Sequence, residues 1–222
     1  MRNSLFAAIL CLACSTSWAA GAACAAPADF EGQAASSEVS HVQRWIVDSS
    51  DNRGTPYLII DKANAKVFAF DARGSFLGAQ PVLLGIGRGD STVAGTGSLK
   101  LSAIRPQDRT TPAGRFVASL DHDLQGKQIL LIDYEAAIAL HPVVTSNPAE
   151  KRMQRLESAT SSDNRISSGC INVEAEFFRK VVSSTFTTTG VVYILPETGK
   201  ASDMFGSYDV DAGVRRRPAT PR

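Results

Sequence analysis

The sequence lacks an excess of charge of either sign. Its 222 residues carry 23 lysines and arginines against 22 aspartates and glutamates, which is a formal net charge of +1 at pH 7. A nucleic-acid-binding protein would show a basic face, so this balance argues against nucleic acid as a partner. Charged residues make up 20% and hydrophobic residues 44% of the chain, a globular composition that argues against a disordered, collagen-like or coiled-coil protein.

The sequence also lacks an apolar run long enough to cross a bilayer. The apolar stretch 5–14 follows Arg2 and precedes the small residues Ser17 and Ala19, and these are the parts of a secretory signal. We therefore predict a signal peptide over residues 1–19, an exported protein of the periplasm or cell envelope, and no stable membrane span after signal removal. An N-terminal helix packed on the domain is the alternative.

Cysteine is scarce, with four in the whole chain. Signal cleavage would remove Cys11 and Cys14 and leave Cys24 and Cys170. If the cut lies beyond Cys24, Cys170 is the one cysteine left, and because exported proteins favour paired cysteines, such a lone thiol needs an explanation. A buried small hydrophobe, a bridge to Cys24 and a catalytic thiol all remain open at this point.

Clusters of metal ligands and phosphate-binding loops are missing as well. The adjacent side chains of residues 121–123 do not share a face, and no second ligand group stands out, so a polar turn is predicted there. The glycine-rich stretch 85–89 is not followed by a helical pattern, which argues against a dinucleotide site. We expect no metal and no cofactor.

Short β-rich runs separated by turn residues predict the fold. The predicted strands are 57–60, 66–70, 79–84, 115–119, 128–133, 136–140 and 191–195. Helical spacing of apolar residues predicts one helix at 38–48 and another at 174–182. Together these elements predict a single mainly β domain, a sandwich or barrel, over residues 57–197.

The two flanks of this domain lack a comparable pattern. Residues 20–56 are predicted to form an Ala-, Gly- and Ser-rich linker followed by the N-terminal helix. Residues 198–222 carry arginines at 215–217 without an apolar period, which predicts a disordered basic tail.

Two stretches carry residues that suit chemistry. His141 ends an apolar strand, and Cys170 follows the polar turn 167–169 just before the predicted helix. An imidazole and a helix N-terminus both favour the thiolate that a cysteine nucleophile needs. The Pro142 carbonyl is an acceptor that could orient the imidazole, and the N–H groups of Gly169 and Cys170 could bind an oxyanion. A cysteine-nucleophile enzyme and a buried structural thiol both remain open.

These residues together resemble the catalytic domain of the L,D-transpeptidases, the YkuD-like family of bacterial cell-wall enzymes. The family has a histidine at a strand end, here His141, and a later Ser/Thr-x-Gly-Cys-hydrophobic-Arg/Asn turn, here residues 167–172. Its upstream Thr-Pro-x-Gly-x-Phe element is matched in full by residues 111–116. The resemblance covers about residues 57–197.

The sequence departs from the family pattern at three places. Ser168 occupies a position that is commonly histidine, and Pro142 occupies one that is usually glycine or serine. The insert 143–165 is longer than in the common pattern and contains a predicted charged helix at 150–157. This insert is interpreted either as a lid or rim over the cleft or as a surface insertion.

The resemblance implies acyl transfer on peptidoglycan stem peptides. Cys170 would attack the carbonyl before the terminal D-alanine, releasing D-alanine and forming a thioester, with His141 as general base and then acid. An amine of a second stem peptide or of a wall-anchored protein would resolve the thioester.

The resemblance also implies roles for the residues around the nucleophile. The substrate and oxyanion positions would be Ser167, Ser168, Gly169, Asn172 and Arg165. Arg165 would bind a substrate carboxylate, and its alternative is an ion pair. Asn172 has a helix N-cap as its alternative.

Three other functions remain as alternatives. Water could resolve the thioester, which would make the protein an L,D-carboxypeptidase. The departures at Ser168 and Pro142 leave room for a catalytically weak wall-binding module. An unrelated exported cysteine peptidase is disfavoured by residues 111–116.

Overall fold

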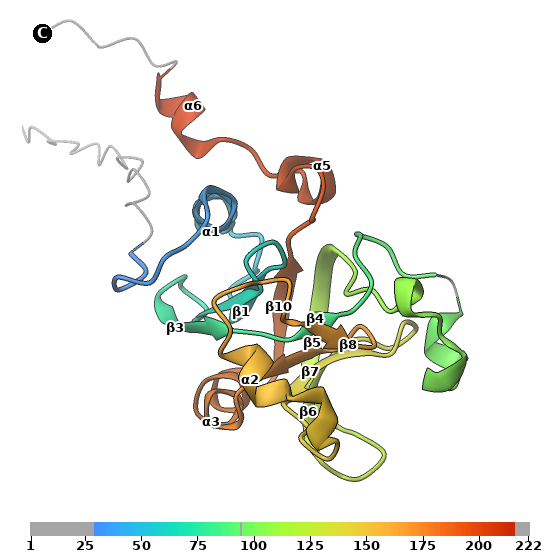
Figure 1. Cartoon of the computed structure of the whole chain (residues 1–222). Coiled ribbons are helices and arrows are strands. Elements are labelled where there is room, and N and C mark those ends of the chain that lie inside the picture. Colours follow the sequence, from blue (N-terminus) through green and yellow to red (C-terminus); the bar gives the residue numbers. More distant parts are fainter. Residues whose placement is uncertain (1–28, 94, 216–222) are drawn as a thin grey trace, which may run out of the picture.

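The computed structural model of the chain describes residues 29–93 and 95–215 (Figure 1). The predicted signal peptide and Cys24 lie outside the described residues. The domain is mainly β with short helices, which confirms the predicted fold class.

The strands are β1 (Tyr57–Asp61), β2 (Lys66–Phe70), β3 (Phe76–Pro81), β4 (Leu84–Gly85), β5 (Gly114–His122), β6 (Gln128–Asp133), β7 (Ile138–Pro142), β8 (Arg165–Ser167), β9 (Ile171–Val173) and β10 (Thr189–Ile194). The α-helices are α1 (Ser37–Ser49), α2 (Arg152–Leu156), α3 (Ala175–Phe177), α4 (Ser183–Thr185), α5 (Ala201–Phe205) and α6 (Val210–Arg215). The 3₁₀ turns are η1 (Thr96–Ser98), η2 (Leu101–Ala103), η3 (Pro106–Asp108) and η4 (Pro148–Glu150), and η5 (Phe178–Val182) is a π-helical turn.

Eight of the strands form one sheet in the order β3-β2-β1-β10-β5-β6-β7-β9, while β4 and β8 form a small second sheet. The β1–β10 and β7–β9 pairs are parallel, and the other neighbours in the large sheet are antiparallel. The chain between β3 and β4 brings the sheet close to closure. Val82 donates to the Ala65 carbonyl at 2.9 Å, and Leu83 exchanges two 2.9 Å backbone hydrogen bonds with Asn172.

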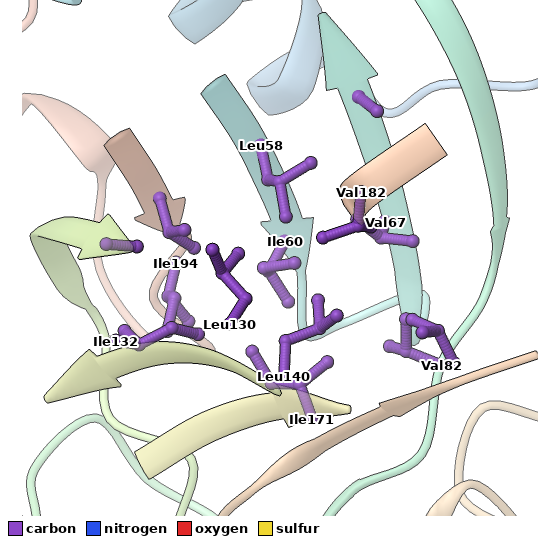
Figure 2. Packing of buried hydrophobic residues seen from close by; sticks show 14 of the residues in the cluster. Leu58, Ile60, Val67, Val82, Leu130, Ile132, Leu140, Ile171, Val182 and Ile194 are labelled. Carbon is purple, nitrogen blue, oxygen red and sulfur yellow. The ribbon is translucent and has the colours of Figure 1, made fainter. Parts of the chain in front are cut away.

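Strands β1, β2 and β10 are buried on both faces of the sheet, and their successive residues point to opposite sides. Leu58 and Ile60 of β1 belong to an inner cluster, whereas Tyr57 and Ile59 belong to an outer cluster. All of these side chains are fully buried. Figure 2 shows part of the inner cluster, which is aliphatic where Leu130, Leu140, Ile171, Val182 and Ile194 converge from five elements.

The outer cluster is rich in aromatic side chains and lies under α1. This helix begins with Ser36, whose Oγ accepts from the Val39 N–H at 3.2 Å, and it ends at Ser50 in the left-handed region with φ of 55°. Its apolar face buries Trp45, which meets Tyr193 of β10 edge to face at 6.1 Å between ring centroids. The helix predicted at 38–48 is therefore confirmed to within a residue at each end.

The predicted disorder after residue 198 is wrong for the part of the tail that the structure describes. Helix α5 packs on the outer cluster, with Ala201 fully buried and Phe205 stacked on Trp45 at 6.5 Å between centroids. The Ala201 N–H donates to the Glu38 carboxylate at 2.7 Å. A five-residue helix has too weak a period to be detected in sequence, and tertiary packing stabilises it. Residues 216–222 lie outside the described residues.

Several predicted elements need correction. The strand predicted at 79–84 is instead β3, which ends at Pro81, and the two-residue β4. Strand β5 runs on through Asp121 and His122, so the polar turn predicted at 121–123 begins only at Asp123. The helix predicted at 174–182 is a continuous helical segment, α3 to α4, with the π-helical turn in its middle.

Across the described residues, no helix combines the length and apolar character that a membrane span requires.

Candidate active site

The parallel pairing of β7 with β9 places the candidate residues side by side. His141 lies directly opposite Asn172, and Leu140 lies opposite Ile171. Leu140 and Ile171 point into the inner cluster, so His141 and Asn172 point to the other face of the sheet. Cys170 immediately precedes β9 and lies on that same side by alternation.

His141 and Cys170 line one cleft with a volume of about 910 Å³. Its other walls come from the β5–β6 hairpin, the first residues of the insert, and the helical segment that follows β9. Charged side chains of both signs line it: Asp121, Asp123, Lys127 and Arg179. The cleft can therefore accept a ligand that carries both charges.

The His141 ring is anchored through one nitrogen. Nδ1 lies 2.8 Å from the carbonyl oxygen of Pro142, which is the acceptor that the sequence analysis expected. Because a carbonyl only accepts, Nδ1 carries the proton of the neutral ring and Nε2 presents a lone pair. Burial lowers the pKa of His141, and the Pro142 hydrogen bond opposes part of that shift. The ring is therefore neutral near pH 7, which is the state in which an imidazole can act as a base.

Cys170 is a free thiol that is partly exposed at the cleft. Its Sγ lies 3.6 Å from the carbonyl oxygen of Ala137, in the turn before β7. Burial raises the pKa of the Cys170 thiol, and the positive charge of Arg152 opposes the shift. At rest the pair is thus a neutral thiol and a neutral imidazole.

The turn before Cys170 requires glycine at position 169. Gly169 has a φ of +122°, and a Cβ there would lie 2.9 Å from both Ile138 Cδ1 and the Thr110 carbonyl oxygen. Its N–H donates to Ser167 Oγ at 3.1 Å, and the Ser167 hydroxyl donates to the Cys170 carbonyl at 2.6 Å. The Gly169 N–H, which the sequence analysis assigned to an oxyanion, is therefore already used inside the turn.

Thr111 supports the same turn from the Thr-Pro-x-Gly-x-Phe element. Its Oγ1 donates to the Gly169 carbonyl at 2.8 Å and accepts from the Gly85 N–H at 2.9 Å. The Thr111 carbonyl accepts from Lys62 Nζ at 3.0 Å. The element matched by sequence thus reaches the nucleophile turn through one buried hydroxyl.

Asn172 lies in β9 and is almost completely buried. Its Nδ2 lies 3.3 Å from His141 Nε2, and its Oδ1 accepts from Arg152 Nη1 at 2.8 Å. The alternative role as a helix N-cap is wrong, because Glu174 caps the helix by accepting from the Phe177 N–H at 3.0 Å.

The structure does not bring Arg165 to the cleft. Its guanidinium is buried in an ion pair with Glu197, and Nη2 also donates to the Lys62 carbonyl at 2.9 Å. The fully buried Lys62 ammonium pairs with Asp90 at 2.7 Å in the same network. Burial lowers the pKa of Lys62, and the hydrogen bond to Asp90 opposes the shift. The alternative of an ion pair is the one found, in the interior rather than on the surface.

The remaining candidate, Ser168, is half-buried and is not among the residues that line the cleft. The sequence analysis missed Arg152, which reaches the site from the insert. Its charged neighbourhood at 150–157 was visible, but no spacing rule links an arginine in the insert to a strand 20 residues later.

Among the described residues, then, a partly exposed cysteine that lines the same cleft as a neutral, carbonyl-anchored histidine defines a candidate cysteine-nucleophile site. The solved structures found to be similar include L,D-transpeptidase catalytic domains. The L,D-transpeptidase of Xylanimonas cellulosilytica is 15% identical over 63% of this chain and 60% of that one, with a TM-score of 0.39. The catalytic domain of the E. faecium L,D-transpeptidase is 15% identical over 64% of this chain and 98% of that one, with a TM-score of 0.38.

Pgp2, the helical cell shape determining protein of Campylobacter jejuni, is 13% identical over 76% of this chain and 60% of that one, with a TM-score of 0.42. The chain thus spans about 60% of the solved chains of Pgp2 and of the Xylanimonas L,D-transpeptidase. No family model and no curated relative matches the sequence. Because these TM-scores are below 0.5, the neighbours do not assign a function to this chain, and only the residues and geometry of its site bear on that question.

Proposed function

We propose that the chain is an exported L,D-transpeptidase that acts on peptidoglycan stem peptides through a Cys170 thioester and releases D-alanine. The observation that carries the proposal is that the free thiol of Cys170 and the Nδ1-anchored imidazole of His141 line one cleft of about 910 Å³. The motif order of residues 111–116, His141 and 167–172 supports the same class.

The first half of the reaction forms the thioester. The Cys170 thiol proton passes to His141 Nε2 as sulfur attacks the carbonyl that precedes the terminal D-alanine. The developing oxyanion is assigned to the Cys170 N–H, since the Gly169 N–H is bonded to Ser167. His141 then returns the proton to the leaving nitrogen, and D-alanine departs with the C–N bond broken.

The second half exchanges the thioester for a new amide. An amine of a second stem peptide or a wall-anchored protein attacks the thioester carbonyl, and His141 accepts the proton that this amine loses. The thiol re-forms as the C–S bond breaks. Because one amide replaces another, the cycle needs no nucleotide, which suits a protein working in the periplasm or cell envelope.

Incubation of the full chain with disaccharide tetrapeptide tests the proposal by mass spectrometry. We expect loss of D-alanine and formation of cross-linked dimer in the wild type and neither product with Cys170→Ala. Tripeptide without dimer, at saturating acceptor, would favour the carboxypeptidase. Absence of both products, together with unchanged intact mass after exposure to a carbapenem, would favour the wall-binding module and overturn the proposal.

A further inference from the structure

We propose that Arg152, supplied by the insert, is a positioning residue that acts through Asn172 to fix which nitrogen of His141 accepts a proton. Its importance for turnover rests on the proposed function, whereas its geometry stands on three side chains. Arg152 Nη1 lies 2.8 Å from Asn172 Oδ1, and Asn172 Nδ2 lies 3.3 Å from His141 Nε2.

The Arg152 guanidinium determines the direction of both hydrogen bonds, the one from Arg152 to Asn172 and the one from Asn172 to His141. A guanidinium has only N–H donors, so the Asn172 atom that faces Arg152 is the carbonyl oxygen. The amide NH₂ of Asn172 therefore faces His141 and can only donate. His141 Nε2 must then present its lone pair, and the ring proton lies on Nδ1, where the Pro142 carbonyl accepts it at 2.8 Å.

Asn172 has little freedom except rotation of its amide. Its backbone N–H and carbonyl are both bonded to Leu83 at 2.9 Å, and its side chain is 1% exposed. A half-turn of the amide would set NH₂ against the Arg152 guanidinium, donor against donor. Arg152 therefore opposes the one rearrangement that would let Asn172 accept a hydrogen bond from an Nε2–H group.

The same arrangement disfavours a protonated His141 at rest. An Nε2–H would face the Asn172 NH₂ group and, beyond it, the positive charge of Arg152. The other charged neighbours come from the β5–β6 hairpin, where Asp123 raises the pKa of His141 and Lys127 lowers it. These two opposite effects offset each other in part, whereas the charge of Arg152 adds to the lowering caused by burial.

The insert holds Arg152 in place. Glu150 pairs with the Arg152 guanidinium, and Arg152 is mostly buried, with a side-chain exposure of 17%. Arg155, one turn further along α2, donates only to the backbone carbonyls of Glu150 and Asp163, each at 3.0 Å. Arg155 thus braces the insert without reaching the site and provides a matched control.

Ring-nitrogen NMR of His141 in the full chain tests the proposal without requiring turnover. Because both the donor and the charge are lost, Arg152→Met is expected to raise the pKa of His141 by about half a pH unit or more. Neutral rings protonated at Nε2 should also become detectable. Arg155→Met should leave the pKa and the protonated nitrogen as in the wild type. His141→Ala identifies the resonances.

The conservative variant separates positioning from bracing of the insert. Arg152→Lys keeps a positive, donor-only group and should restore most of the wild-type pKa. Equal shifts in Arg152→Met and Arg155→Met, or no shift in Arg152→Met, would overturn the proposal. A shift confined to Arg152→Met in a protein that releases no D-alanine would uphold the positioning role and count against the transpeptidase assignment instead.

Discussion

The inner and outer clusters pack against opposite faces of one sheet but carry different parts of the molecule. The inner cluster is built mostly of aliphatic side chains and includes Leu140 of β7 and Ile171 of β9, the neighbours of His141 and Asn172. The outer cluster holds most of the buried aromatic side chains and packs against α1 and α5, which contribute no residue to the cleft.

This difference assigns separate roles to the two clusters. A change at the inner cluster moves a strand that carries the site, since Leu140 and His141 share a backbone. A change at the outer cluster loosens helices that only cover the sheet. Stability and chemistry are therefore separable in this domain, and variants of the two clusters and of the site can measure how completely.

Removing the nucleophile should give the largest effect. Cys170→Ser leaves a hydroxyl of similar size at the cleft but a far weaker nucleophile, so acyl transfer should fall by about three orders of magnitude or more. The melting temperature should stay close to that of the wild type, because Cys170 belongs to neither cluster. Release of D-alanine and a thermal melt measure the two quantities. Substantial residual activity would remove Cys170 from its role.

Loss of the base should rank next. His141→Ala should slow thioester formation by about a hundredfold to ten-thousandfold, the usual contribution of a positioned general base. His122→Ala is the matched control, since His122 also lines the cleft but lies at the exposed end of β5. Stopped-flow acylation compares the two variants. Similar rates for both would show that any cleft histidine matters equally, which contradicts the assigned role.

The pH dependence of the thiol should distinguish the site from the outer cluster. Burial raises the pKa of Cys170, so its alkylation by iodoacetamide should rise about tenfold per pH unit up to and beyond the ordinary thiol pKa of about 8.5. Burial also raises the pKa values of Tyr57 and Tyr193 in the outer cluster, so these phenols stay neutral over that range. A plateau reached below pH 7 would indicate a resting thiolate and contradict the neutral pair.

The sequence predicted most of the sheet because β-rich runs bounded by turn residues were visible in the longer strands. Strands β2 and β6 have the predicted bounds, and β1 differs by one residue. The three-residue strands β8 and β9 were missed, since three residues are too few to show a period of two. Yet β9 carries Asn172, so the strand that aligns the site was among those that the sequence pattern did not reveal.

The candidate site was predictable as far as the motif extended along the chain. Residue type and flanking pattern singled out His141, Pro142 and Cys170. The expected hydrogen bond between His141 Nδ1 and the Pro142 carbonyl is present in the structure. Arg165 was predicted to bind a substrate carboxylate, but it forms a buried ion pair with Glu197 from a distant part of the chain. Arg152 went unnoticed for the same reason, because pairing between distant segments leaves no local pattern.

A pair of core truncations tests the difference between the inner and outer clusters directly. Leu140→Ala and Ile59→Ala each empty a fully buried aliphatic site, and each should lower the free energy of unfolding by about 2–5 kcal/mol. Only Leu140→Ala should also slow acylation several-fold in the fraction that remains folded, because the cavity lies beneath His141. Denaturant unfolding and active-site titration separate the two losses. Equal slowing of acylation in both variants would mean that the outer cluster positions the site as much as the inner cluster does.

The smallest effect is expected at the edge of the outer cluster. Arg44 of α1 and Asp211 of α6 form an ion pair at 2.9 Å, with side-chain exposures of 30% and 47%. Water screens such a pair, so Asp211→Asn should lower the free energy of unfolding by only about 0–1 kcal/mol and leave acylation unchanged. Asp108→Asn, which breaks an ion pair with Arg105 on the other side of the domain, is the control. An activity change in Asp211→Asn would mean that the helices over the outer cluster influence the site after all, and the separation between the two clusters would fail.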